Sequence, residues 1–314
     1  MRRIAPILAT LLLAACATTA DPATTVGIGS TTTTSVASEF PVTVEDDNGE
    51  VTIERRPVAV VSLSPTATEM LFAIGAGPQV VAVDDQSNYP EEAPSTELSG
   101  FTPNLEAILS YQPDLVILAS EPAGAPVSTG LAETGVPALV LDGAQSLEDV
   151  YRQIDVVGEA TGNLEAAQSL NEELRREIES ILGEAGPAGE GLTYYHELDP
   201  SFFTVTSSTF IGQVYALLGM ENIADPADPE GTGYPQLSAE YIVAQDPDMV
   251  FLADADFGES AESLAARPGW EGMSALESGA VVELDADIAS RWGPRIVDFL
   301  RTVADAVQRH SPSV

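Results

Sequence analysis

Lysine is absent from the 314-residue sequence, and 12 arginines stand against 49 acidic residues, which gives a formal net charge of −37. A chain this negative repels nucleic-acid phosphates and anionic lipid headgroups, which excludes electrostatic binding to either. One cysteine and two histidines are too few for an internal disulfide, a cysteine-based metal centre or a histidine cluster. Because Gly-x-Ser-x-Gly, Walker A and His-Glu-x-x-His motifs are also absent, we expect no enzymatic activity, metal site or cofactor.

Residues 1–16, MRRIAPILATLLLAAC, combine two arginines, an apolar run and small residues, a pattern typical of a secretory signal. The apolar run is about half of the roughly 20 residues that span a bilayer. The final Leu-Ala-Ala-Cys resembles a bacterial lipobox, whereas the alternative is an ordinary signal followed by an incidental cysteine. We expect an acylated Cys16 to hold the protein on the extracytoplasmic face of the cell membrane. Residues 17–40, rich in threonine, serine and alanine, are expected to be a tether.

In the rest of the chain, short apolar runs alternate with helical patterns, which predicts an α/β fold with mainly parallel sheets. Before them, VTVEDDNGEVTIE predicts a hairpin around Asn48-Gly49. In SPTATEMLFAIG, Ser64 is expected to cap a helix that Gly75 ends. The expected buried strands are VAVVSL (58–63), QVVAV (79–83), DLVIL (114–118), PALVL (137–141), LTYYHEL (192–198), FFTVT (202–206), DMVFL (248–252) and AVVEL (280–284).

Residues 163–182 have apolar side chains at every third or fourth position, with charged residues between them, which predicts one long amphipathic helix. Its place between two α/β segments favours a rigid connector over an ordinary surface helix. We therefore expect an N-terminal lobe at 41–160, a connecting helix at 161–185 and a C-terminal lobe at 186–314.

The two halves share a motif: LEAILSYQPDLVIL (105–118) aligns without gaps with AEYIVAQDPDMVFL (239–252). The repeated Pro-Asp is explained locally, since proline ends a helix and aspartate opens the turn into a strand. The matching acids Glu106 and Glu240 fall in the first helical turn, where the helix dipole favours them. Two equivalent acids would also suit a twofold-symmetric partner that carries matching arginines.

Several long motifs resemble the periplasmic binding proteins that deliver cobalamin and ferric siderophores to ATP-driven importers, the helical-backbone class. They include VVSLSPTATEMLFAIGAG, VDDQSNYPEEA, IGQVYALLGMENIAD, YPQLSAEYIV and RWGPRIVD, and the resemblance extends from about Val42 to Arg309. It implies the class III fold, two Rossmann-like α/β lobes joined by a single long helix. It also implies a monomer whose Glu106 and Glu240 dock onto a dimeric ABC permease with its ATPase.

Within this family the motifs are most similar to those of vitamin B12 binders, which implies a corrinoid captured between the lobes. The resemblance places ligand contacts at Gln86, Phe101, Tyr234, Asp287 and Arg291. One tryptophan position of the B12 binders falls here at Ala119 or Ser120, which leaves a ferric siderophore or haem as alternative ligands. An envelope adhesion or assembly protein with the same fold is an alternative of another class.

Charge favours a neutral or weakly cationic ligand, because anionic catecholate siderophores need a cluster of basic residues. Only Arg291, Arg295 and Arg267 are placed near the cleft by the motifs. A bare-ion site at residues 194–197 is disfavoured, since adjacent strand residues point to opposite faces. We expect His196 to be a structural histidine.

Overall fold

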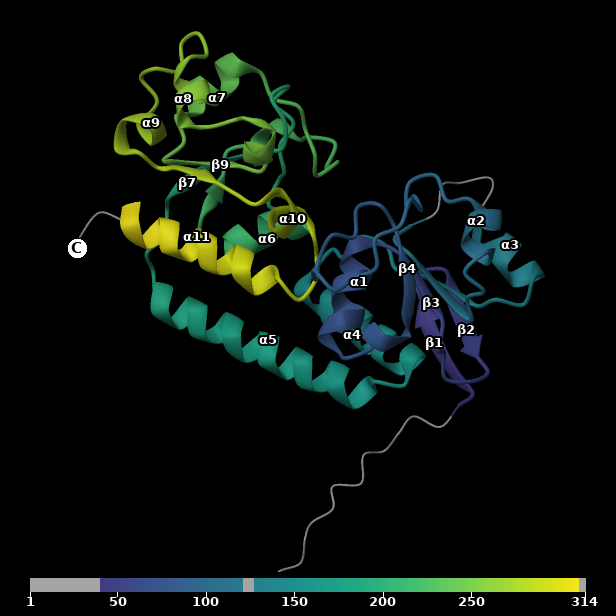
Figure 1. Cartoon of the computed structure of the whole chain (residues 1–314). Helices are drawn as coiled ribbons and strands as arrows, with labels where there is room; N and C mark the ends of the chain where they lie inside the picture. Colours follow the sequence, from purple (N-terminus) through teal and green to yellow (C-terminus); the bar gives the residue numbers. More distant parts are fainter. Residues whose placement is uncertain (1–39, 121–126, 311–314) are drawn as a thin grey trace, which may run out of the picture. The chain divides into compact units, whose positions relative to one another are not determined.

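Two four-stranded parallel sheets with equivalent strand order form the framework of the molecule (Figure 1), in a computed structural model that describes residues 40–120 and 127–310. Cys16 and the expected tether up to residue 39 lie outside the described residues. The sheet orders are β4-β3-β5-β6 and β8-β7-β9-β10, so the expected α/β class is confirmed. The strands are β3 (Val60–Leu63), β4 (Val80–Val83), β5 (Leu115–Leu118), β6 (Ala138–Val140), β7 (Thr193–Glu197), β8 (Glu221–Asn222), β9 (Met249–Leu252) and β10 (Val281–Glu283).

Helices connect these strands and cover the sheets. The first lobe contains α1 (Pro65–Ala73), α2 (Leu105–Leu109), α3 (Val127–Glu133) and α4 (Leu147–Thr161). After α5 (Leu164–Ala185) follow α6 (Phe210–Leu217), α7 (Ala239–Gln245), α8 (Ala261–Ala265), α9 (Ser274–Ser278), α10 (Ala286–Ser290) and α11 (Ile296–His310). Short 3-10 turns are η1 (Gly77–Gln79), η2 (Asp225–Ala227) and η3 (Ala255–Phe257). None of the helices within residues 40–120 and 127–310 is long and apolar enough to cross a membrane.

The two aspartates of the repeated motif hold the same position in each sheet. The Asp114 carboxylate accepts hydrogen bonds from the backbone N–H groups of Val58 and Ala59, just before β3. The Asp248 carboxylate accepts from the backbone N–H and hydroxyl of Thr193, at the start of β7. Each aspartate therefore sets the register of two neighbouring strands, a longer-range role than the turn expected from the sequence.

The local expectations at the start of the globular part are confirmed. The hairpin consists of β1 (Val42–Asp46) and β2 (Gly49–Ile53), although Gly49 already pairs with Asp46, so the two-residue turn is Asp47-Asn48. The Ser64 hydroxyl caps α1 by accepting from the N–H of Ala67, and Gly75 follows the helix with a φ of 78°.

The expected strand at 202–206 is wrong. Phe202 has a φ of 69°, which interrupts the extended backbone, and Phe203 makes only an isolated bridge with Gln236. The segment still contacts β7 and its end, because the carbonyl of Phe203 accepts the N–H of Leu198 and the Thr204 hydroxyl donates to the carbonyl of His196. The N–H groups of Thr204 and Thr206 donate to the carbonyls of Pro235 and Gly233 in another loop. The edge position in the sheet is taken by the short strand β8, which the sequence pattern did not indicate.

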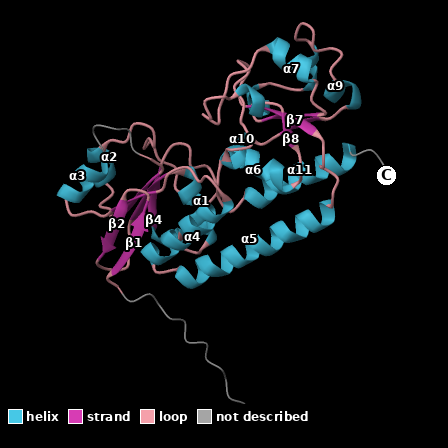
Figure 2. Cartoon of the chain, turned by 180° about the vertical axis from the view of Figure 1, so that it is seen from behind, coloured by secondary structure: helices cyan, strands magenta, loops and turns pink. Residues whose placement is uncertain are grey.

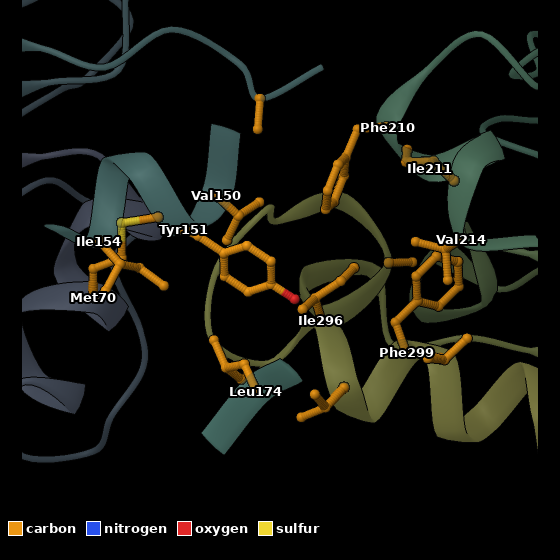
Figure 3. Close-up of a cluster of buried hydrophobic side chains, with 14 of the residues drawn as sticks. Met70, Val150, Tyr151, Ile154, Leu174, Phe210, Ile211, Val214, Ile296 and Phe299 are labelled. Atoms are coloured by element: carbon orange, nitrogen blue, oxygen red, sulfur yellow. The ribbon is translucent and has the colours of Figure 1, made fainter. Parts of the chain in front are cut away.

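The two lobes share helices and a hydrophobic core. The expected connector is α5, and α11 lies along it (Figure 2), where Arg301 pairs with Glu177 at 3.1 Å. Figure 3 shows side chains from α1, α4, α5, α6 and α11 in a single buried cluster. Tyr151 of α4 lies at its centre and is 5% exposed. The core is therefore continuous from the first lobe to the second.

Candidate functional site

The carboxylate of Glu69, on α1 of the first lobe, pairs with two arginines of the second lobe. Arg291 Nη1 lies 2.9 Å from Oε1, and Arg295 approaches with Nη2 2.6 Å from Oε1 and Nε 3.0 Å from Oε2. Glu69 is 2% exposed. The hydrogen bonds that Arg295 donates to the Glu69 carboxylate raise the pKa of the Arg295 guanidinium. A buried acid thus joins the lobes through charge-assisted hydrogen bonds.

Arg291 extends this network to the loop after β4. Its Nη2 donates to the Gln86 carbonyl at 3.0 Å and lies 2.7 Å from Asp287 Oδ1. Asn88 accepts from Arg291 at 3.0 Å and donates to Asp287 Oδ2 at 2.7 Å. The structure therefore brings together three of the five expected ligand residues, and the side chains of Asp287 and Arg291 bond to protein groups.

Phe101 lies on a loop that passes over the carboxyl end of the first sheet. Leu98 bridges to Asp84 just after β4, and Gly100 packs so closely that a Cβ would lie 2.6 Å from Asp84 Oδ2. The same Cβ would lie 2.9 Å from the carbonyl oxygen of Leu63, at the end of β3. Phe101 follows with 84% of its surface exposed. The ring therefore stands at the strand edge where open α/β sheets bind ligands.

Tyr234 occupies a loop of the second lobe and is 51% exposed. The preceding Gly233 has a φ of 82° and donates its N–H to the Asp228 carboxylate at 2.7 Å. In residues 40–120 and 127–310, no hydrogen bond or ring contact links Tyr234 or Phe101 to the Arg291 network. At the end of β5, Ala119 is partly buried and Ser120 is exposed, and neither is aromatic.

Glu106 and Glu240 are both exposed, in the first turns of α2 and α7. The helix caps are other residues, since the side chains of Asn104 and Ser238 accept the N–H groups of the first turn. Within the described part of the chain, neither glutamate side chain has a hydrogen bond or an ion pair. The two carboxylates are thus presented to solvent at equivalent places in the repeat.

Arg267 lies in a separate group of charges at the carboxyl ends of β7 and β9. Its guanidinium donates to the carboxylates of Glu197, at 2.5 and 2.6 Å, and Glu259, at 2.7 Å. Asp254 is 2% exposed, and both of its carboxylate oxygens lack a hydrogen-bond partner. Burial, reinforced by the negative charge of Glu197, raises the pKa of Asp254 to about 7.

His196 is buried in β7, and its Nδ1 lies 2.8 Å from the hydroxyl oxygen of Tyr215. Burial lowers the pKa of His196 to about 3, which leaves the ring neutral. Within the described residues, no group of three or more histidine, cysteine, aspartate or glutamate side chains is arranged to hold a metal ion.

A cavity of about 800 Å³ lies between β2 and the edge strand β6. Its lining includes Asn48, Glu50, Pro113, Thr129 and Gly135. None of the residues expected to bind the ligand contributes to it, so this cavity is separate from the place where the lobes meet.

Three residues of the network were not identified from the sequence: Glu69, Asn88 and Tyr89. The guanidinium carbon of Arg295 lies over the Tyr89 ring, 4.2 Å from its centroid. Glu69 and Arg295 lie inside the motifs that carry the family resemblance. The available signal was an acid directly before the apolar run 70–74, because an acid on a buried helix face needs a cationic partner.

We predict that Glu69→Gln lowers the free energy of unfolding by about 3 kcal/mol. The substitution removes the negative charge that Arg291 and Arg295 share, and both guanidinium groups are largely buried. Urea unfolding would measure this loss. The matched control is Glu177→Gln, which removes the exposed partner of Arg301 and should cost about 0.5 kcal/mol or less. Equal losses in the two variants would contradict the role given to Glu69.

We predict that Asp254→Asn changes how stability depends on pH. With a folded pKa of about 7 and an ordinary value of 3.8, the folded state retains a proton that the unfolded state loses between these values. This group therefore lowers stability as pH rises through that interval. Urea unfolding should show similar stability for both proteins near pH 4 and a variant more stable by about 4 kcal/mol at pH 8. A difference that does not vary with pH would refute the prediction.

Comparison with known proteins identifies the family. A model of the periplasmic binding protein family matches residues 60–288. YvrC of Bacillus subtilis (strain 168), an uncharacterized ABC transporter substrate-binding lipoprotein, is 30% identical over 309 residues, which cover 96% of this chain and 94% of that protein. A cobalamin-binding protein of Halobacterium salinarum (strain ATCC 29341 / DSM 671 / R1) is 33% identical over 282 residues, covering 86% of this chain and 75% of that protein.

Among solved structures, the periplasmic heme-binding protein RhuT from Roseiflexus sp. RS-1, in its apo form, is similar with a TM-score of 0.69 at 25% identity. The match covers 82% of this chain and 100% of that chain. The matching family model spans well over half of the sequence, and the two lobes with their connecting helix have the expected class III architecture. The chain therefore belongs to the periplasmic binding protein family.

Proposed function

We propose that this protein is the extracytoplasmic solute-binding lipoprotein of an ABC importer, and that it captures a corrinoid between its two lobes. Membership of the periplasmic binding protein family supports the importer role. The 33% identity to a cobalamin-binding protein supports the ligand. An acylated Cys16 would keep the receptor at the membrane, and the naming of the Bacillus subtilis relative as a lipoprotein supports that attachment.

The observation that carries the ligand proposal is the pairing of the arginines. Arg291 and Arg295 bond to Glu69, and Arg267 bonds to Glu197 and Glu259. An anionic ligand would have to compete with these carboxylates, each already in place. By contrast, the exposed rings of Phe101 and Tyr234 are free to cover the apolar face of a neutral macrocycle.

In this proposal, Gln86, Phe101 and Tyr234 contact the ligand, whereas Asp287 and Arg291 hold the lobes in the geometry that forms the cleft. Gln86 suits this division, because its backbone carbonyl bonds to Arg291 while its side chain is exposed. A haem ligand is the second candidate, favoured by the similarity to a solved heme-binding protein.

We propose further that Glu106 and Glu240 dock the receptor onto two equivalent arginine-bearing surfaces of a dimeric permease. Both carboxylates are exposed, and they occupy equivalent positions in a repeat. Since Asn104 and Ser238 already cap the helices, the glutamates are available to a partner. Opposite charges across such an interface increase the association rate and fix its orientation.

Ligand identity can be tested by titrating the whole exported protein with candidate ligands. Binding is monitored through the fluorescence of Trp270 and Trp292. We predict that cyanocobalamin binds at least about 10-fold more tightly than ferric enterobactin, an anionic catecholate, because the paired arginines offer that ligand no free cation. Hemin and ferrichrome complete the panel. Tighter binding of the catecholate would contradict the corrinoid proposal, and tighter binding of hemin would favour the second candidate.

The docking role predicts that the double variant Glu106→Arg, Glu240→Arg lowers uptake by cells at least about 10-fold, because each charge reversal places like charges together. The affinity of the purified variant for cyanocobalamin should not change. Glu165→Arg with Glu172→Arg, two exposed acids on α5, is a control with the same change in net charge. Normal uptake by the Glu106 and Glu240 variant would exclude the docking role of these two glutamates.

A further inference from the structure

Phe257 shares an unusual exposure with Phe101. Each ring is 84% exposed, more than any other large hydrophobic side chain among the described residues. A single exposed apolar residue is common on protein surfaces, so exposure alone does not indicate a site. Phe257 differs from such a residue in its position beside the sheet and in the ordered turn that carries it.

Phe257 ends the turn η3, a few residues beyond the carboxyl end of β9. In open α/β sheets, ligands bind outside the carboxyl ends of the strands. The sequence repeat makes β9 the counterpart of β5, which is followed by Ala119 and Ser120. The second lobe therefore carries an exposed aromatic ring beyond a strand whose counterpart is followed by small residues.

The turn that carries the ring is fixed at several points. The N–H groups of Phe257 and Gly258 donate to the carbonyls of Asp254 and Ala255, each at 2.9 Å. Gly258 has a φ of 104°, a conformation that L side chains rarely adopt. The ring is thus presented to solvent by an ordered turn.

The same turn is bonded to the segment that joins the lobes. Asp256 Oδ2 accepts the N–H of Ala286 at 3.2 Å, at the start of α10. The next residue, Asp287, bonds to Asn88 of the first lobe. Phe257 therefore adjoins the residues through which the second lobe meets the first, on the ligand-binding edge of its sheet.

We propose that Phe257 is a further ligand-contacting residue, the counterpart in the second lobe of Phe101 in the first. This inference rests on the proposed function, because it requires that a solute be captured between the lobes. The two rings would cover apolar surface of one ligand from opposite lobes, which favours a large ligand with an extended apolar face. Phe257 would then determine specificity for such ligands over small polar solutes.

The test compares Phe257→Ala with Tyr111→Ala in the full exported protein, with cyanocobalamin and hemin as the probes. Tyr111 is an exposed aromatic residue near Asp114, which binds the amino end of β3, so it lies away from the ligand-binding edge. We expect Phe257→Ala to raise the dissociation constant of the bound probe about 10-fold, and Tyr111→Ala to leave it unchanged. The melting temperature of Phe257→Ala should not change, because the ring is outside the core.

Each outcome decides the proposal. If the wild-type protein binds neither probe, the proposed function fails and this inference fails with it. If the wild type binds a probe and Phe257→Ala binds it equally well, the inference alone is overturned. Normal affinity combined with reduced uptake would instead make Phe257 a contact for the permease, which also overturns its role in ligand binding.

Discussion

The buried carboxylate of Glu69 pairs with two largely buried arginines of the opposite lobe. In surroundings of low dielectric constant, such a group of charges is stable only when each member has its partners. The segment that carries Arg291 and Arg295 therefore cannot move away from α1 without leaving charge uncompensated. The paired charges therefore oppose separation of the two lobes at this point.

The contacts of three arginines explain why these basic positions hold arginine and not lysine. Arg267, Arg291 and Arg295 each bind carboxylates through more than one guanidinium nitrogen. Lysine offers a single ammonium group and cannot make these forked contacts. At these three positions the use of arginine follows from geometry. These three arginines pair with carboxylates inside the protein. Most acidic residues that have no such partner face solvent, where their net negative charge favours solubility.

Most of the fold could be predicted from the sequence, because buried strands and amphipathic helices leave regular patterns of apolar residues. The repeat even located equivalent glutamates in the two lobes. The segment 202–206 failed for a physical reason: its apolar residues pack beside a turn and bond to a loop, and periodicity cannot distinguish such a segment from a strand. The sequence placed Gln86, Asp287 and Arg291 together but did not identify Glu69 as the partner of Arg291 and Arg295, because these pairs join residues more than 200 positions apart. Side-chain pairing over that distance leaves no local pattern.

The single core shared by the two lobes has a consequence for how the chain unfolds. Phe299 and Ile296 of α11 pack in the same cluster as Tyr151 of α4 and Leu174 of α5. Apolar side chains of both lobes therefore lie in one contiguous buried cluster. Unfolding of either lobe would expose apolar surface of the other, so the two lobes are expected to unfold in a single cooperative transition.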